Sequence, residues 1–158
     1  MKEQARGFTL IELLIVIAII AILAAVVFVA LDPLSRFQDA RNSQRWSDVA
    51  AIIDAIKVDQ VDNGGSYIEE VATTTAGSAY TIGTCATGGD ADCSATTTQA
   101  SCVDLSGLVS EGYLGSIPQD PSSGTANKTD YYLIRKSSGI ITVGACDAEG
   151  GENISISR

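Results

Sequence analysis

The chain begins with a long apolar segment near its N-terminus. Every residue from 13 to 31 is apolar, and the run extends back to Phe8 when Thr9 and Glu12 are included. A helix needs about 20 consecutive apolar residues to cross the hydrocarbon core of a bilayer. The pattern therefore predicts a membrane-spanning helix over residues 8–31. A slight basic excess precedes it, which predicts a cytoplasmic N-terminus and an exported remainder.

Two ordinary explanations compete with a specialised role for this segment. A secretory signal peptide usually has an apolar region of about 7 to 15 residues, which is shorter than the run seen here. Bulky side chains in residues 26–30 also crowd the position where a small-residue cleavage site would lie. A plain signal anchor is therefore the stronger of the two alternatives.

A second pattern, with helical spacing, follows the apolar run. Residues 38–61 contain no glycine or proline, and a stripe of helical spacing has Trp46 beside it; its members are Val49, Ile52, Ile53, Ile56 and Gln60 or Val61. We expect the charged residues to lie mostly off that stripe, on a solvated face; they are Asp39, Arg41, Arg45, Asp48, Asp54, Lys57 and Asp59. The sequence predicts an amphipathic helix within residues 32–63 that continues into a globular domain.

Prolines and glycines mark both ends of this second helix. Asp32-Pro33 separates it from the apolar segment, because proline removes a helical hydrogen bond and should kink or open the chain there. Asn63-Gly64-Gly65 is a stop signal, since glycine readily adopts the left-handed conformation that closes a helix.

Residues 64–158 have the pattern of a small head domain. Residues 131–136 and 140–145 are rich in β-branched and aromatic residues and are joined by Ser137-Ser138-Gly139, which predicts a β-hairpin. Further expectations for this region are a short helix over 103–111, an edge strand over 154–157 and a surface connection over 73–101. The predicted fold class is α+β, with a long N-terminal helix, half transmembrane and half amphipathic, packed on a small antiparallel sheet.

Charge and composition exclude several functions. The formal net charge is −9, whereas a surface that follows phosphates needs clustered lysine and arginine, so no direct nucleic-acid partner is expected. The chain has no histidine, which removes the commonest general base and transition-metal ligand. We therefore expect a protein that is not an enzyme.

Gly7 and Glu12 lie in a more specific motif. An acidic residue inside an apolar membrane segment costs up to about 2.5–3.5 kcal/mol, so Glu12 implies a partner. The alternative is a side chain that extends to the lipid headgroups and has no function. The stretch Gly7–Val16 reads GFTLIELLIV and resembles the prepilin cleavage and methylation motif of type IV pilins and type II secretion pseudopilins. This resemblance implies a leader over residues 1–7, cleavage after Gly7 by a prepilin peptidase, and methylation of Phe8.

The chemistry of this motif suggests how subunits would align. Cleavage creates an α-amino group at Phe8, and a neighbouring helix shifted along its axis can place its Glu12 beside that cation. Each charge then offsets the desolvation cost of the other. Such a pair would fix the register between subunits, as buried polar pairs do in coiled coils.

The resemblance implies a pilin-like structural subunit. It would be a single-pass protein of the cytoplasmic membrane as a precursor and part of an extracellular or cell-surface filament once assembled. Its partners would be further copies of itself in a helical homopolymer, prepilin peptidase, and a membrane assembly platform of a pilus or secretion system. A pseudopilin or minor pilin is the alternative within the family, and a signal-anchored surface binding module is the alternative outside it. Adhesion, motility, DNA uptake and secretion all remain open.

Four cysteines in an exported chain favour two disulfides, with three possible pairings. We expect Cys85 to pair with Cys93, and Cys102 with Cys146. The second bond would resemble the C-terminal disulfide loop of many pilins and stabilise the chain by about 4 kcal/mol. Zinc is disfavoured because the spacings lack a C-x-x-C pair.

An acidic segment near the C-terminus is a candidate calcium site. Residues 112–121 and the paired tyrosines that follow resemble the corresponding part of type II secretion major pseudopilins, which often hold calcium in a C-terminal loop. Asp147, Glu149 and Glu152 lie within six residues among glycines and would supply oxygen ligands. The spacing is not that of an EF-hand, so a solvated acidic turn is the favoured alternative. No other cofactor is expected.

Overall fold

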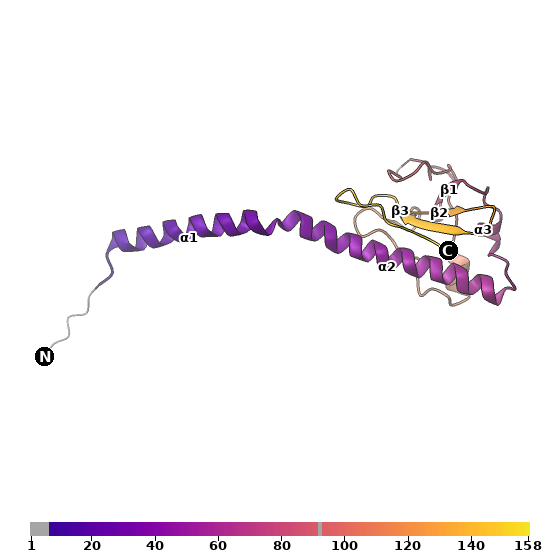
Figure 1. Cartoon of the computed structure of the whole chain (residues 1–158), viewed down its shortest axis with the longest axis horizontal. Coiled ribbons are helices and arrows are strands. Elements are labelled where there is room, and N and C mark those ends of the chain that lie inside the picture. The colour runs from indigo at the N-terminus through magenta and orange to yellow at the C-terminus, as the bar shows by residue number, and fades with distance from the viewer. Residues whose placement is uncertain (1–6, 92) are drawn as a thin grey trace. The chain divides into compact units, whose positions relative to one another are not determined.

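The computed structural model describes residues 7–91 and 93–158, so six of the seven residues of the expected leader lie outside the described part. The chain divides into two compact units, Met1–Phe37 and Gln38–Arg158. The first holds the apolar helix, and the second holds the sheet together with most of the second helix (Figure 1).

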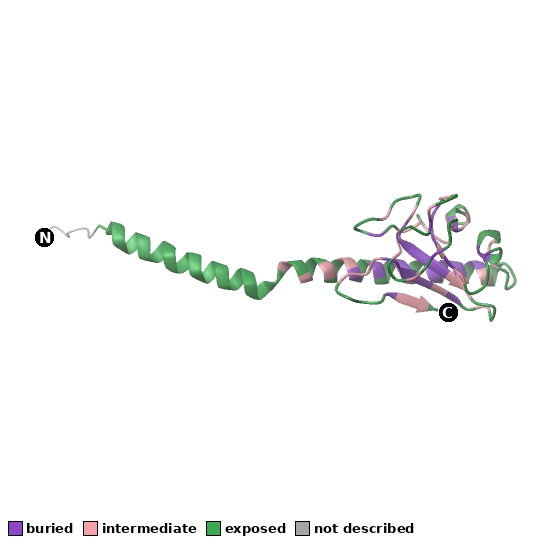
Figure 2. Cartoon of the chain, turned by 90° about the horizontal axis from the view of Figure 1, so that it is seen from above, coloured by how far each residue is buried: buried purple, intermediate pink, exposed green. Residues whose placement is uncertain are grey.

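The apolar run forms helix α1, Leu10–Leu31, in which no residue is buried (Figure 2). The predicted break after it is confirmed. Asp32 adopts the left-handed conformation, with φ of 36°, and ends α1, while Pro33 is the first residue of helix α2. Proline fits there because the backbone N–H at a first helical position has no partner within the helix. Among the described residues, the helical stretch that begins at Leu10 is long and apolar enough to cross a membrane.

Helix α2, Pro33–Asp62, packs one face against the sheet within the second unit. Its predicted stop is confirmed: Gly64 and Gly65 both have positive φ, and the N–H of Gly65 donates to the carbonyl of Gln60 at 2.7 Å. The predicted apolar stripe is confirmed at Val49, Ile52, Ile53 and Ile56, which are fully buried; Figure 2 shows the corresponding buried face of α2. It does not extend to Val61, which is 76% exposed.

The sheet has four antiparallel strands in the order β1-β2-β3-β4. They are β1 Ala79–Thr81, β2 Tyr131–Arg135, β3 Ile141–Ala145 and β4 Ser155–Ser157. The predicted hairpin is β2–β3, with Leu133 opposite Val143, and the predicted edge strand is β4. Tyr132 of β2 lies opposite Gly144 of β3, and its ring packs directly on the backbone of this glycine. A Cβ added to Gly144 would lie 2.5 Å from that ring. The α+β class expected from the sequence is therefore the observed fold.

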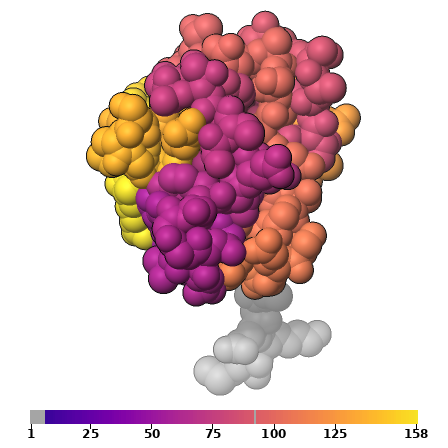
Figure 3. Space-filling view, turned by 90° about the vertical axis from the view of Figure 1, so that its right-hand side faces the viewer, coloured from indigo at the N-terminus to yellow at the C-terminus, as the bar shows by residue number. Residues whose placement is uncertain are grey.

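Two expectations for the loops are wrong in part. Helix α4 spans only Ser106–Ser110, because Val103 instead bridges to Ile82 and donates its N–H to Thr81 at 2.9 Å. The 73–101 connection is not wholly a surface loop, since it contains β1 and a parallel bridge between Ala79 and Thr98. In the space-filling view this region packs against its neighbours in the head (Figure 3). A further short helix, α3, spans Glu69–Ala72.

The charged residues of α2 lie mostly off its buried face, as expected, but three of the seven do not. Arg45 and Asp59 are fully buried, and Asp48 is 8% exposed. Buried charges are tolerated where hydrogen bonds satisfy them, and among the described residues every buried side-chain nitrogen or oxygen has a partner. The phenolic hydroxyl of Tyr131, for example, donates to Asp48 at 2.7 Å. Burial and this bond to a carboxylate both raise the pKa of Tyr131.

Candidate functional site

Helix α1 presents apolar side chains on all of its sides. Its large apolar residues and the preceding Phe8 are between 46% and 81% exposed. A helix that is hydrophobic all round requires lipid or other helices as its surroundings. The exposed apolar surface of α1 fits a membrane-anchored helix, and the one carboxylate of α1 lies in its first turn.

That carboxylate closes a capping box with Thr9. Thr9 is the N-cap of α1, and its hydroxyl oxygen accepts a hydrogen bond from the backbone N–H of Glu12 at 3.3 Å. In return, Oε2 of Glu12 accepts from the backbone N–H of Thr9 at 2.8 Å and from its hydroxyl at 2.6 Å. Two backbone donors that a helix start leaves unpaired are thereby satisfied.

The bond between Gly7 and Phe8 lies outside the helix. Helix α1 begins at Leu10, Phe8 is 81% exposed, and a Cβ added to Gly7 would meet nothing within 4 Å. The two residues expected to flank a cleavage are thus in non-helical, accessible backbone. Within a single chain the partner of Glu12 is Thr9, and its expected pairing with Phe8 of another subunit stays a prediction.

Residues 4–28 match the family model described as the prokaryotic N-terminal methylation motif, which is the signature of type IV pilins and pseudopilins. This chain carries a prokaryotic N-terminal methylation motif. The matched methylation motif includes Gly7, Phe8, Thr9 and Glu12 and most of α1. No curated protein matches the chain, and neither does any solved structure.

The residue of this site that sequence reasoning missed is Thr9. Its signal was present, since a threonine three residues before a glutamate, ahead of an apolar run, is the pattern of a capping box. The sequence predicts a partner for Glu12 on a neighbouring subunit, whereas in the described structure its carboxylate accepts from two donors on Thr9.

The four cysteines form two disulfides, but the expected pairing is wrong. Cys85 is bonded to Cys102, and Cys93 to Cys146. Backbone pairing explains the first bond, because the N–H of Cys102 donates to the carbonyl of Cys85 at 3.0 Å. The second follows from contact with the end of β3, where the carbonyl of Cys146 accepts from the hydroxyl of Ser94 at 2.7 Å.

The structure does not gather the expected calcium ligands. No group of three or more histidine, cysteine or acidic residues among the described positions could hold a metal ion. Glu149 is instead engaged by arginines: Arg41 donates to both of its carboxylate oxygens at 2.6 Å, and Arg45 donates to one at 2.9 Å. The positive charge beside Glu149 comes from these two side chains of α2.

Arg45 joins two loops of the head to α2. Beyond Glu149, its guanidinium donates to both oxygens of Asp120, at 2.5 and 3.0 Å, and to the hydroxyl of Ser122 at 2.9 Å. The amide of Asn42 adds two bonds to the backbone of Glu149, at 2.8 and 3.1 Å. We call Asn42, Arg45, Asp120 and Glu149 the α2 clamp.

The pKa values of both carboxyl groups of the clamp are lowered, by Arg45 within the clamp and by its neighbours Arg41 and Ser122. Burial by itself would raise the pKa of Asp120, but hydrogen bonds from Arg45 and Ser122 outweigh it and hold this pKa below its usual value. Hydrogen bonds from Arg41 and then from Arg45 lower the pKa of Glu149 from 4.5 to about 2. Both groups are therefore more acidic in the folded chain than in the unfolded chain.

This difference predicts acid sensitivity of the head. The unfolded chain binds more protons than the folded chain between pH 4.5 and about 2, so stability from Glu149 should be complete above pH 4.5 and decline as the pH falls through that interval. The measurement is the urea midpoint as a function of pH. In a Glu149→Gln variant the midpoint should start lower and vary less with pH; an unchanged slope would contradict the assignment.

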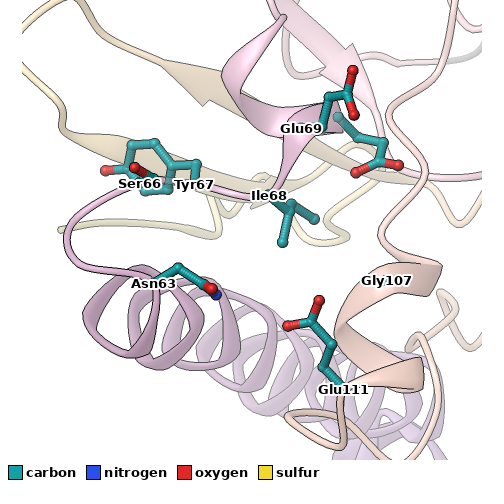
Figure 4. Close-up of a pocket in the computed structure, with 8 residues that line it drawn as sticks. Asn63, Ser66, Tyr67, Ile68, Glu69, Gly107 and Glu111 are labelled. Atoms are coloured by element: carbon teal, nitrogen blue, oxygen red, sulfur yellow. The ribbon is translucent and has the colours of Figure 1, made fainter.

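A separate open pocket of about 480 Å³ lies at the C-terminal end of α2. Figure 4 shows Ile68 and Glu111 pointing into it from opposite sides, with Asn63 at the end of α2 forming part of its wall. Glu69 and Glu70 make its rim acidic. None of the residues expected from the methylation motif lines this pocket.

Proposed function

We propose that this chain is a structural subunit of a type IV pilus-like filament, cut after Gly7 and polymerised through α1. The observation that carries the proposal is the exposed start of α1: an apolar helix with one carboxylate at its first turn, preceded by an accessible, non-helical Gly7-Phe8 bond. The methylation motif points to a structural rather than an enzymatic family.

Cleavage would change the electrostatics of this helix start. Before the cut, the carboxylate of Glu12 is held by Thr9 and no cation lies on the helix itself. After the cut, the new amine of Phe8 is a cation that also needs a partner in an apolar environment. Pairing between Glu12 of one subunit and Phe8 of the next satisfies both groups and sets the axial stagger.

The same features support a membrane-anchored precursor. The exposed apolar surface of α1 suits lipid before assembly and the corresponding helices of other subunits afterwards. The partners we propose are prepilin peptidase, an assembly platform in the membrane, and further copies of this chain. Because pseudopilins share the methylation motif, a secretion pseudopilin or minor pilin is the second candidate.

Replacing Glu12 by glutamine tests the assembly role of its charge. Glutamine can still form the capping box with Thr9, so processing should continue while the charge that would pair with Phe8 is lost. We expect at least about a tenfold loss of sheared surface filaments per mature subunit, because the unpaired amine would be buried without a partner.

The matched control is Glu3→Gln, which removes a carboxylate that would leave with the leader. It should assemble like the native chain. Normal filament yield from mature Glu12→Gln subunits would contradict the register role, and a chain that anchors but never forms filaments would favour a signal-anchored binding module.

A further inference from the structure

We propose that Thr9 is a positioning residue for processing: its capping box ends α1 before the Gly7-Phe8 bond and so presents that bond to the peptidase. This inference rests on the proposed cleavage after Gly7. Its basis is the juxtaposition of the Thr9 hydroxyl, the Glu12 carboxylate and a scissile bond that lies outside the helix.

The reaction itself requires accessible backbone. Water adds to the carbonyl carbon of Gly7, the bond to the nitrogen of Phe8 breaks, and that nitrogen takes a proton to leave as an amine while Gly7 becomes a carboxylate. A peptide unit inside a helix has its N–H and C=O groups directed along the helix axis and hydrogen-bonded to neighbouring turns. A peptidase must unwind such a unit before cutting it.

Without the capping box, we expect the helix to begin earlier in the chain. The apolar segment continues to Phe8, and in lipid each unpaired backbone group favours a longer helix. Gly7 is itself an acceptable N-cap, ranked close to threonine, whereas valine is a poor one. If Gly7 became the N-cap, Phe8 would be the first helical residue and the scissile bond would join the helix.

The capping box decides between these two starts. Thr9 has an extended backbone, with φ of −82° and ψ of 151°, so the helix does not continue towards the N-terminus beyond it. Its reciprocal hydrogen bonds with Glu12 favour a helix start here over one at Gly7. Phe8 and Gly7 then lie outside α1. The match to the prokaryotic N-terminal methylation motif, over residues 4–28, includes the same positions.

The direct test compares Thr9→Val with Thr9→Ser in the full-length precursor. Valine keeps the branched shape and removes the hydroxyl, while serine keeps the hydroxyl and remains a good N-cap. Purified prepilin peptidase is added to each precursor in detergent, and kcat and KM are determined from the appearance of the shortened chain by intact mass.

Thr9→Val should raise KM several-fold, up to about tenfold, with kcat nearly unchanged, because only the fraction with a non-helical Phe8 can bind. Thr9→Ser should restore the native KM. The ¹³Cα chemical shift of Phe8 should move towards helical values in Thr9→Val alone. A native KM for Thr9→Val, or an equal defect in Thr9→Ser, would overturn the proposal.

The Glu12→Gln variant separates this inference from the proposed function. Its filament yield tests the assembly role of the Glu12 charge, whereas the KM of Thr9→Val compared with Thr9→Ser tests the positioning of the scissile bond. Normal filaments from Glu12→Gln would refute the assembly role and leave the positioning role of Thr9 standing. A native precursor that is not cut after Gly7 would overturn both.

Discussion

Replacing Arg45 by methionine should lower the free energy of unfolding of the head by about 3–5 kcal/mol. Arg45 has no exposed side-chain surface, and it donates to both oxygens of Asp120, which is buried as well. Its loss leaves the Asp120 carboxylate buried without a cation, which costs more than the ion pair itself contributes. Urea unfolding followed by circular dichroism measures the change.

Two controls make the Arg45 result specific. Arg41→Met removes an arginine that is 32% exposed and bonded to Glu149, so its effect should be much smaller. The double change Arg45→Met with Asp120→Leu should recover most of the loss, because it removes the unpaired charge as well. A defect no larger than that of Arg41→Met would show that the buried pair contributes little.

Removing the Cys93–Cys146 disulfide should destabilise the head more than removing Cys85–Cys102. The first bond spans a sequence separation of 53 and the second a separation of 17. In the chain-entropy model these loops correspond to about 4 and about 3 kcal/mol, since a longer loop restricts the unfolded chain more. Alanine pairs at each bond, compared by urea midpoint, test the ranking.

The expected cysteine pairing makes a different prediction. If Cys85 were bonded to Cys93, and Cys102 to Cys146, neither alanine pair would remove one bond cleanly. Each pair would instead leave two unpaired thiols. Mass analysis of non-reduced proteolytic fragments distinguishes the two patterns, and fragments linking Cys85 to Cys93 would contradict the structure.

The elements that could be predicted from the sequence are those with strong local signals. The apolar run predicted α1, and Asp32-Pro33 predicted its end. Two β-branched segments separated by Ser137-Ser138-Gly139 predicted the β2–β3 hairpin. Each of these depends on neighbouring residues and on one periodicity. The α+β class followed from their order.

The burial of charge on α2 could have been predicted from helix geometry alone. Arg45 precedes Val49 by four residues, and Asp59 follows Ile56 by three, so both share the face of the apolar stripe. We assigned these residues to the solvated face because they are charged, although their spacing places them on the buried face. What the sequence does not show is the partner, because Asp120 and Glu149 come from distant loops that only the folded backbone brings to α2.

The expected cysteine pairing is wrong because it treated spacing along the chain as a guide to distance in space. The disulfides follow non-local contacts, such as that of Ser94 with the carbonyl of Cys146, and Glu149 lies against arginines more than 100 residues earlier in the chain. At the N-terminus, by contrast, the site is local, and only the role of Thr9 was overlooked.

The most direct test of the central claim is the intact mass of the subunit in surface filaments made by a host with its own prepilin peptidase. The filaments are sheared from cells, identified by electron microscopy and dissolved for mass spectrometry. The account predicts a chain that begins at Phe8, carries one added methyl group and retains two disulfides. A filament subunit that still begins at Met1, or surface filaments that lack this chain, would contradict it.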